Sequence, residues 1–221
     1  MSSSLHFAAQ REMMVDCQIR TVDVTDPALL SAMYDVPRER FVVPEYVALA
    51  YADRSLPSAG GKRQLLAPMV IARMIQAARL RGNERVLDIA VGSGYSAALM
   101  SRLAASVVAV ESDAGLTEAA RAALGELGVT NVLFVTGPLE KGCPADAPYD
   151  VILLNGAVEE APTGLLGQLV ERGRLIAIDA SAGAPKAVLF ERIGNETTRR
   201  LLFDAAAPVL DGFRKAPGFV F

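Results

Sequence analysis

VLDIAVGSGY, residues 86–95, is the stretch that decides the fold. Apart from Asp88, its first six residues are apolar, which predicts a buried strand. Gly92 and Gly94 allow a tight turn that other residues rarely adopt, and an apolar helix is expected at 95–104. The first turn of that helix offers free backbone N–H groups beside the carboxyl end of the strand. This unit predicts a doubly wound, Rossmann-like α/β fold that binds a nucleotide-type ligand at that end.

Strands and helices alternate through the rest of the chain. Short strands separated by amphipathic helices imply a parallel sheet with right-handed crossovers. Two further stretches near the C-terminus predict antiparallel strands that close the sheet. The expected strands are 85–90, 106–111, 131–136, 149–155, 173–179, 187–193 and 199–204, with helices at 113–127 and 162–171.

The part before residue 85 is predicted to be helical. A helix is expected up to about Ile19, and a second starts at Thr25-Asp26-Pro27, where a capping side chain precedes a proline. A third helix is expected at 68–80, after a flexible glycine-containing loop at 56–61. We therefore predict an N-terminal helical region, 1–80, and an α/β region, 81–221, that form one structural unit.

Asp88 distinguishes between the ligands that the turn could hold. Gly92, Gly94 and Ala97 also satisfy the dinucleotide pattern, which is weak evidence alone. A pyrophosphate needs no acid inside the strand, whereas the ammonium and sulfonium groups of S-adenosylmethionine would be stabilised by one. Glu111 ends the next apolar run and can accept hydrogen bonds from both ribose hydroxyls. S-adenosylmethionine is the expected cofactor, with NAD and a purely structural turn as alternatives.

Composition narrows the class of protein. The chain has 221 residues, 52% of them hydrophobic, and a net charge of −3, which argues against a nucleic-acid partner. No cluster of basic residues is visible in the sequence, and Cys17 and Cys143 lack the spacing of a metal site. No apolar run approaches about 18 residues, so no membrane span is expected. Without the pattern of a signal peptide at its start, the chain is expected in the cytoplasm.

Several blocks resemble protein-L-isoaspartate O-methyltransferases. They are MVDCQIR (14–20), VPRERFV (36–42) and AYADRSLP (50–57), followed by 86–95, 149–152 and 161–176. The resemblance covers most of the chain, and the N-terminal blocks are specific to this family among methyltransferases. It implies a monomeric-type S-adenosylmethionine fold whose N-terminal helices shape the peptide site; beyond this, the oligomeric state stays open. The implied reaction methylates the α-carboxyl group of isoaspartyl residues in damaged proteins, which starts their repair.

The chain departs from the family pattern at three places. Gln64 and Leu66 stand where the family has a Thr-x-Ser pair that contacts the substrate carboxylate. Pro138 replaces the acid of a Gly-Asp-Gly turn near the adenine pocket. Ala90 replaces the first glycine of the cofactor loop; we expect its methyl group to crowd the ligand and its backbone to adopt strand dihedrals without strain.

These losses affect positioning and not proton transfer. A carboxylate is already ionised at neutral pH, so its methylation needs no general base, in keeping with a chain whose only histidine is His6. The catalytic residues stay unassigned. Lys62 and Arg63 could replace the missing hydroxyls by holding the substrate carboxylate, or they could be solvated loop charges.

The expected cofactor site combines positions from four strand ends. Asn155 is expected either to meet the methionine end of the cofactor or to cap its strand, and Tyr95 either to pack over the cofactor or to lie in the core. One alternative function is a homologue that has lost activity and serves as a binding or regulatory module. Another is methylation of a small molecule or nucleic acid, although 155–158 lacks the prolines and aromatic residue of adenine-methylating enzymes. The expected cofactor-binding residues are Asp88, Ala90, Gly92, Ser93, Gly94, Tyr95, Glu111, Ser112, Pro138, Leu139 and Asn155.

Overall fold

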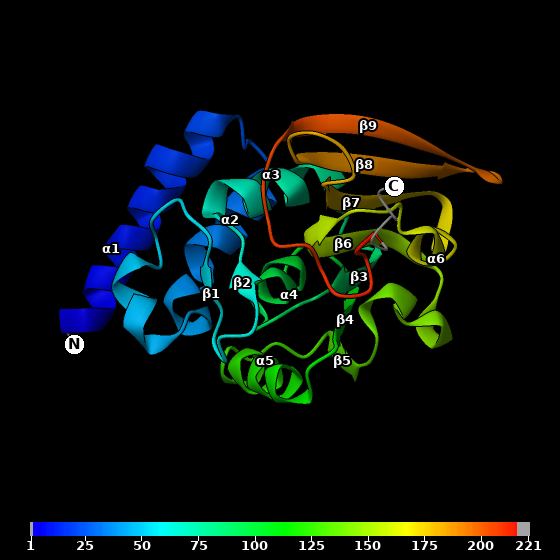
Figure 1. Ribbon diagram of the computed structural model, residues 1–221. Coiled ribbons are helices and arrows are strands. Elements are labelled where there is room, and N and C mark those ends of the chain that lie inside the picture. Colours follow the sequence, from blue (N-terminus) through cyan, green and yellow to red (C-terminus); the bar gives the residue numbers. More distant parts are fainter. Residues whose placement is uncertain (1, 216–221) are drawn as a thin grey trace, which may run out of the picture.

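A seven-stranded sheet in the order β5-β4-β3-β6-β7-β8-β9 runs through the computed structural model, which describes residues 2–215 (Figure 1). Neighbouring strands from β5 to β7 are parallel, and β8 and β9 are antiparallel. The predicted α/β class with antiparallel C-terminal strands is confirmed. The strands are β3 (Arg85–Ile89), β4 (Ser106–Glu111), β5 (Val132–Thr136), β6 (Tyr149–Val158), β7 (Leu169–Asp179), β8 (Lys186–Ile193) and β9 (Glu196–Asp204).

Helices cover both faces of this sheet and extend beyond it at the N-terminus (Figure 1). Helix α3 packs against β7 and β8, and α5 against β4 and β5. The α-helices are α1 (Ser2–Met14), α2 (Pro27–Asp35), α3 (Pro68–Ala78), α4 (Tyr95–Met100), α5 (Ala114–Glu126) and α6 (Thr163–Leu166). A π-helical turn covers Val15–Ile19, and 3₁₀ turns cover Arg20–Val22, Arg38–Phe41, Pro44–Leu49, Leu139–Lys141 and Pro144–Asp146.

Capping side chains begin two of the helices. Asp26 accepts hydrogen bonds from the N–H groups of Ala28 and Leu29, and Pro27 occupies the first helical position of α2. Asp113 accepts from the Leu116 N–H at the start of α5. The start predicted for α2 from its capping side chain and proline is therefore correct, and α5 begins one residue after the expected position 113.

Several predicted elements are wrong in extent. The helix expected at 95–104 ends at Met100, and the strand expected at 173–179 begins at Leu169. The helix expected at 162–171 is only α6, because β7 already begins at Leu169, which pairs with Tyr149 of β6. The loop expected at 56–61 contains β1 (Leu56–Pro57), which pairs with β2 (Gln64–Leu65) to form a small hairpin. The Ser58 N–H donates to the Arg63 carbonyl and closes the hairpin loop. This hairpin carries Arg63 to the carboxyl ends of the central strands.

Apolar side chains form one core on each face of the sheet. The larger core joins the N-terminal helices to the sheet through residues such as Met14, Met33 and Ile176. The other contains Leu87 and Ile152 of the central strands. The boundary between 1–80 and 81–221 stays a prediction. Among residues 2–215, no helix has the length and apolar character that crossing a bilayer requires.

Candidate functional site

The glycine turn and Glu111 form one hydrogen-bonded unit at the carboxyl ends of β3 and β4. Gly92 and Gly94 have φ angles of 56° and 100°, which favour glycine. A Cβ atom at Gly94 would lie 2.6 Å from a Leu124 methyl carbon, so the close packing of α4 and α5 also requires glycine there. The Gly92 N–H donates to Glu111 Oε2 over 3.1 Å. The two parts of the predicted site are thus in direct contact.

Ala90 has a backbone conformation that the sequence analysis did not predict. Its φ angle is 58°, in the left-handed region, where the expectation was strand dihedrals without strain. The turn begins directly after Ile89, the last residue of β3. The Ala90 N–H donates a hydrogen bond to the Val110 carbonyl of β4 over 2.9 Å. Left-handed backbone costs a residue with Cβ about 1 kcal/mol or more. The cost explains why a glycine suits this position.

Glu111 is fully buried, and its carboxylate has an internal cationic partner. Arg63 donates to Glu111 Oε1 from Nη2 over 2.9 Å and from Nε over 3.2 Å. Arg63 Nη2 also donates to the Ser112 hydroxyl over 2.8 Å, and the Ser112 N–H donates to Glu111. The Arg63 stem lies above Gly92, where an added Cβ would be 3.4 Å from that of Arg63. The Arg63 guanidinium therefore occupies the Glu111 carboxylate oxygens that are predicted to accept hydrogen bonds from a ribose.

Asp88 is also fully buried, but its partners are neutral. Ser96 Oγ donates to one carboxylate oxygen over 2.7 Å and Asn155 Nδ2 to the other over 2.6 Å. Burial raises the pKa of Asp88 to about 7, while these two hydrogen bonds oppose the rise. Asn155 Nδ2 also donates to the Ile89 carbonyl over 3.1 Å. Asp88 thus fixes Asn155, which links β6 to β3.

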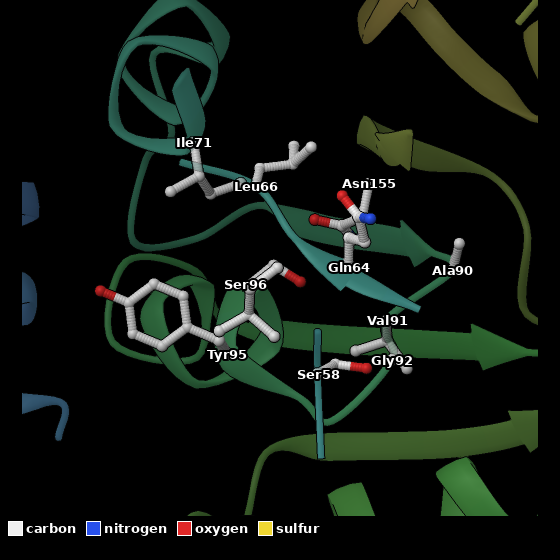
Figure 2. A pocket seen from close by; sticks show the side chains of 11 residues that line it. Ser58, Gln64, Leu66, Ile71, Ala90, Val91, Gly92, Tyr95, Ser96 and Asn155 are labelled. Atoms are coloured by element: carbon white, nitrogen blue, oxygen red, sulfur yellow. The ribbon is translucent and has the colours of Figure 1, made fainter. Parts of the chain in front are cut away.

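Two hollows border this unit. A cavity of about 20 Å³, which suits about one water molecule, is lined by Ala90, Gly92, Asn155 and hairpin residues (Figure 2). A cleft of about 210 Å³ adjoins Arg63, Asn155 and the segment 208–210. Gln64 and Asn155 line both hollows and lie near each other in Figure 2. Both hollows therefore lie beside the residues that the sequence predicts to bind a cofactor.

Tyr95 lies mainly in the core. Figure 2 shows its ring directed away from Asn155 and Ala90. The ring centroid is 5.5 Å from that of Phe41 and 4.8 Å from the guanidinium carbon of Arg38. Burial raises the pKa of the Tyr95 hydroxyl. The side chain borders the small cavity but packs against the N-terminal region.

Other predicted residues have structural partners. Ser93 Oγ donates to the Phe41 carbonyl over 2.6 Å, and Lys62 forms an ion pair with Asp113. Pro138 and Leu139 lie in the turn that follows β5. The N–H of Gly137, the first residue of this turn, donates to the Glu111 carbonyl over 3.0 Å and holds the turn beside β4. The side chain of Leu139 is buried in the core. Their roles towards a cofactor stay predictions.

Arg38 is a residue that the sequence analysis quoted only as part of a family block. It is fully buried, and it donates from Nε to the Ala50 carbonyl and from Nη2 to the Leu66 carbonyl, each over 2.8 Å. Burial lowers its pKa. The bond to the Leu66 carbonyl holds this residue in place just before α3. Because Leu66 lines the small cavity, Arg38 supports the cavity wall without lining it. In the sequence Arg38 lies in a short charged run, Arg38-Glu39-Arg40, which gives no sign that its side chain is buried.

The fold and this site define a class. A mostly parallel sheet, a glycine turn after its central strand and a buried acid at the end of the next strand are the features of a Rossmann-like S-adenosylmethionine-dependent methyltransferase fold. Within residues 2–215, no cluster of three potential metal ligands occurs.

The chain belongs to the protein-L-isoaspartate(D-aspartate) O-methyltransferase family, whose model matches residues 9–200. It is 42% identical over 170 residues to a protein-L-isoaspartate O-methyltransferase of Koribacter versatilis, covering 77% of this chain and 76% of that one. A relative from Rhodopseudomonas palustris, protein-L-isoaspartate O-methyltransferase 1, is 40% identical over 194 residues, 87% and 79% of the two chains.

Solved structures agree with the fold. A protein-L-isoaspartate O-methyltransferase superposes with a TM-score of 0.82 at 30% identity, over 91% of this chain and 66% of that one. A Plasmodium falciparum structure described as a putative member of the family, in complex with S-adenosyl-L-homocysteine, superposes with a TM-score of 0.75 over 91% and 98%; at 18% identity it supports the fold alone.

Proposed function

We propose that this chain transfers the methyl group of S-adenosylmethionine to the carboxylate of isoaspartyl residues in proteins. The observation that carries the proposal is the buried carboxylate of Glu111, which is bonded to the glycine turn in a chain of this family. An isoaspartyl-containing protein or peptide is the proposed substrate, and the cytoplasm is the proposed compartment.

The residues present suit a ribose at Glu111. The carboxylate already accepts two N–H donors of Arg63, and a vicinal diol offers two hydroxyl donors in their place. Asp88 would act through Asn155 at the reacting end, because both of its oxygens are already bonded. Cofactor binding then requires that Arg63 leave Glu111.

The proposed chemistry needs orientation more than acid–base catalysis. The cofactor supplies an electrophilic methyl carbon. When bound, it would give this methyl group to a substrate carboxylate oxygen and leave as the thioether, so no proton transfer by a side chain would be required. This chain's task is to hold the carboxylate in line, and orientation of this kind contributes up to about 7–11 kcal/mol in favourable cases. The side chains proposed to orient the carboxylate are those of Gln64, Leu66 and Asn155, which line the small cavity.

Radiolabelled methyl transfer to an isoaspartyl peptide, beside its normal aspartyl twin, tests the proposal. Label on the isoaspartyl peptide alone is the expected result. Glu126→Gln, which changes an exposed carboxylate paired with Arg40, is a matched control and should retain the activity. Label on both peptides equally would contradict the assigned substrate.

A second candidate is a homologue with weakened activity that binds the cofactor without efficient transfer. The ion pair of Arg63 with Glu111 and the small volume of the cavity lined by Leu66 favour it. Calorimetry with S-adenosylhomocysteine separates the two candidates. Binding without label on either peptide supports this second candidate, whereas binding with specific label supports the first.

A further inference from the structure

A cavity lined by five arginines lies at the end of the sheet opposite Glu111. Its volume is about 290 Å³, close to the lower limit for small-molecule sites. Its lining residues come from the end of α3, the loop that follows it, and β7, β8 and β9. Ala77 and Leu189 form an apolar wall. The charged lining residues are Arg79, Arg81, Arg172, Arg174, Arg200 and Glu191.

Two of these arginines have structural partners. Arg174 donates to both oxygens of the buried Glu84 over 2.9 and 2.8 Å, and to the last carbonyls of α3. Arg172 forms an exposed ion pair with Glu191 over 3.4 Å. The helix end and the two nearby acids are therefore already neutralised. They do not account for the remaining arginines.

Arg79, Arg81 and Arg200 are the remaining three. Their side chains are exposed and make no hydrogen bond or ion pair to any of the described residues. Unpaired positive charges that converge on one cavity repel each other, unless an anion binds there. The chain as a whole has a net charge of −3, so such a cluster is not a consequence of composition.

Arg79 adds an independent observation. It caps the C-terminus of α3 with a φ angle of 50°, at a position where glycine is the usual residue. An arginine there costs stability relative to glycine and turns its charge towards the cavity. Strain of this kind is typical of residues kept for a function.

We infer that this cavity, defined by Arg79, Arg81, Arg172, Arg174 and Arg200, binds a diphosphate group. Guanidinium groups bind phosphate oxygens bidentately, and three unpaired positive charges match the charge of a pyrophosphate anion. An adjoining hollow of about 260 Å³ shares Arg79 and Arg200 and reaches Phe203. It offers room for the nucleoside of a nucleoside diphosphate.

Isothermal titration with inorganic pyrophosphate and with ADP tests this site, in the presence of saturating S-adenosylhomocysteine so that the cofactor cleft is filled. Both probes are expected to bind, more weakly as salt rises. The double substitution Arg79→Gly with Arg200→Ala should weaken binding by about tenfold or more. Arg199→Ala is the matched control, because Arg199 is adjacent to Arg200 in sequence but pairs with Asp179. It should change the affinity less than about twofold.

The single substitution Arg79→Gly separates a binding role from a structural one. Glycine relieves the left-handed backbone, so the Tm should rise while the affinity for pyrophosphate falls. Tighter binding of ADP than of pyrophosphate would identify a nucleotide as the ligand, and equal binding would identify the diphosphate alone. The inference fails if neither probe binds, or if Arg199→Ala weakens binding as much as the double substitution does. None of these outcomes depends on methyl transfer.

Discussion

The two ends of the parallel strands carry their charges in opposite ways. At the carboxyl ends, Asp88 and Glu111 are fully buried, and both carboxylates have hydrogen-bond donors in place. At the amino ends, Arg79 and Arg200 are exposed and form no ion pair with a described residue. A buried charge is costly without partners, whereas an exposed one costs little and stays available to a ligand. At the carboxyl ends, the charged side chains therefore affect the stability of the fold. At the amino ends, they remain available to bind a ligand.

The largest expected effect concerns Asp88 and pH. Its pKa is about 7 in the folded chain, against 3.8 for the ordinary group. The folded state therefore holds a proton that the unfolded state releases above about pH 4. The protonated Asp88 therefore contributes to the free energy of unfolding. This contribution is fully present below about pH 4 and is lost as the pH rises through about 7, a decrease of about 4 kcal/mol in all. Urea unfolding of the wild type and Asp88→Asn from pH 4 to 8 measures it.

Asp88→Asn should remove that loss, because an amide does not ionise and Ser96 can reorient its hydroxyl. The free energy of unfolding of the wild type should fall, relative to the variant, between pH 4 and 8. Parallel profiles for the two proteins would mean that Asp88 titrates normally, and the contrast between buried and exposed charge would be weakened.

Glu111→Gln should have the next largest effect, on cofactor affinity. Hydrogen bonds to a charged acceptor contribute about 1.5–3 kcal/mol each, so the loss of two should weaken S-adenosylhomocysteine binding by about a hundredfold or more. Calorimetry measures the dissociation constant. As a control, Glu126→Gln makes the same substitution at an exposed carboxylate and should leave the dissociation constant unchanged. Affinity retained in Glu111→Gln would move the ribose away from this strand end.

Arg174→Ala should destabilise the fold, unlike Arg200→Ala. Removing Arg174 leaves the carboxylate of Glu84 buried without its partner. Full burial would cost about 3–5 kcal/mol, and the partial exposure of Arg174 reduces this to about 2 kcal/mol. Arg200→Ala should change stability by less than about 0.5 kcal/mol. Thermal unfolding of both variants checks the difference; equal destabilisation would mean that Arg200 also has a structural role.

The same contrast separates what the sequence could predict from what it could not. The sheet, the glycine turn and Glu111 follow from short-range patterns, since a strand and the turn after it are contiguous. Glu111 and the glycine turn come together because β3 and β4 are parallel neighbours, which alternation of strand and helix predicts. Local sequence did not predict the left-handed Ala90, because the end of β3 is set by pairing with β4.

Contacts between distant segments lay beyond the sequence pattern. The ion pair of Arg63 with Glu111 joins residues 48 positions apart. The five arginines of the cavity come from the loop after α3 and from β7 and β9, so each segment contributes only one or two of them. The length of helix α6 was overestimated because Leu165, Leu166, Leu169 and Val170 recur at helical spacing, although Leu169 and Val170 already belong to β7. Such contacts depend on the register of whole strands.

The smallest expected effect is that of Arg63→Ala on cofactor affinity. Cofactor binding in the wild type has to break the contacts of Arg63 with Glu111 and Ser112, which the variant lacks. The affinity for S-adenosylhomocysteine should therefore rise by up to about tenfold, or about 1.4 kcal/mol, as measured by calorimetry. Lys62→Ala removes a neighbouring, exposed charge paired with Asp113 and should change the affinity less than about twofold. If Arg63 instead holds the substrate carboxylate, the affinity will stay constant and the KM for the isoaspartyl peptide will rise. A fall in affinity would contradict both roles, because Arg63 would then support the cofactor directly.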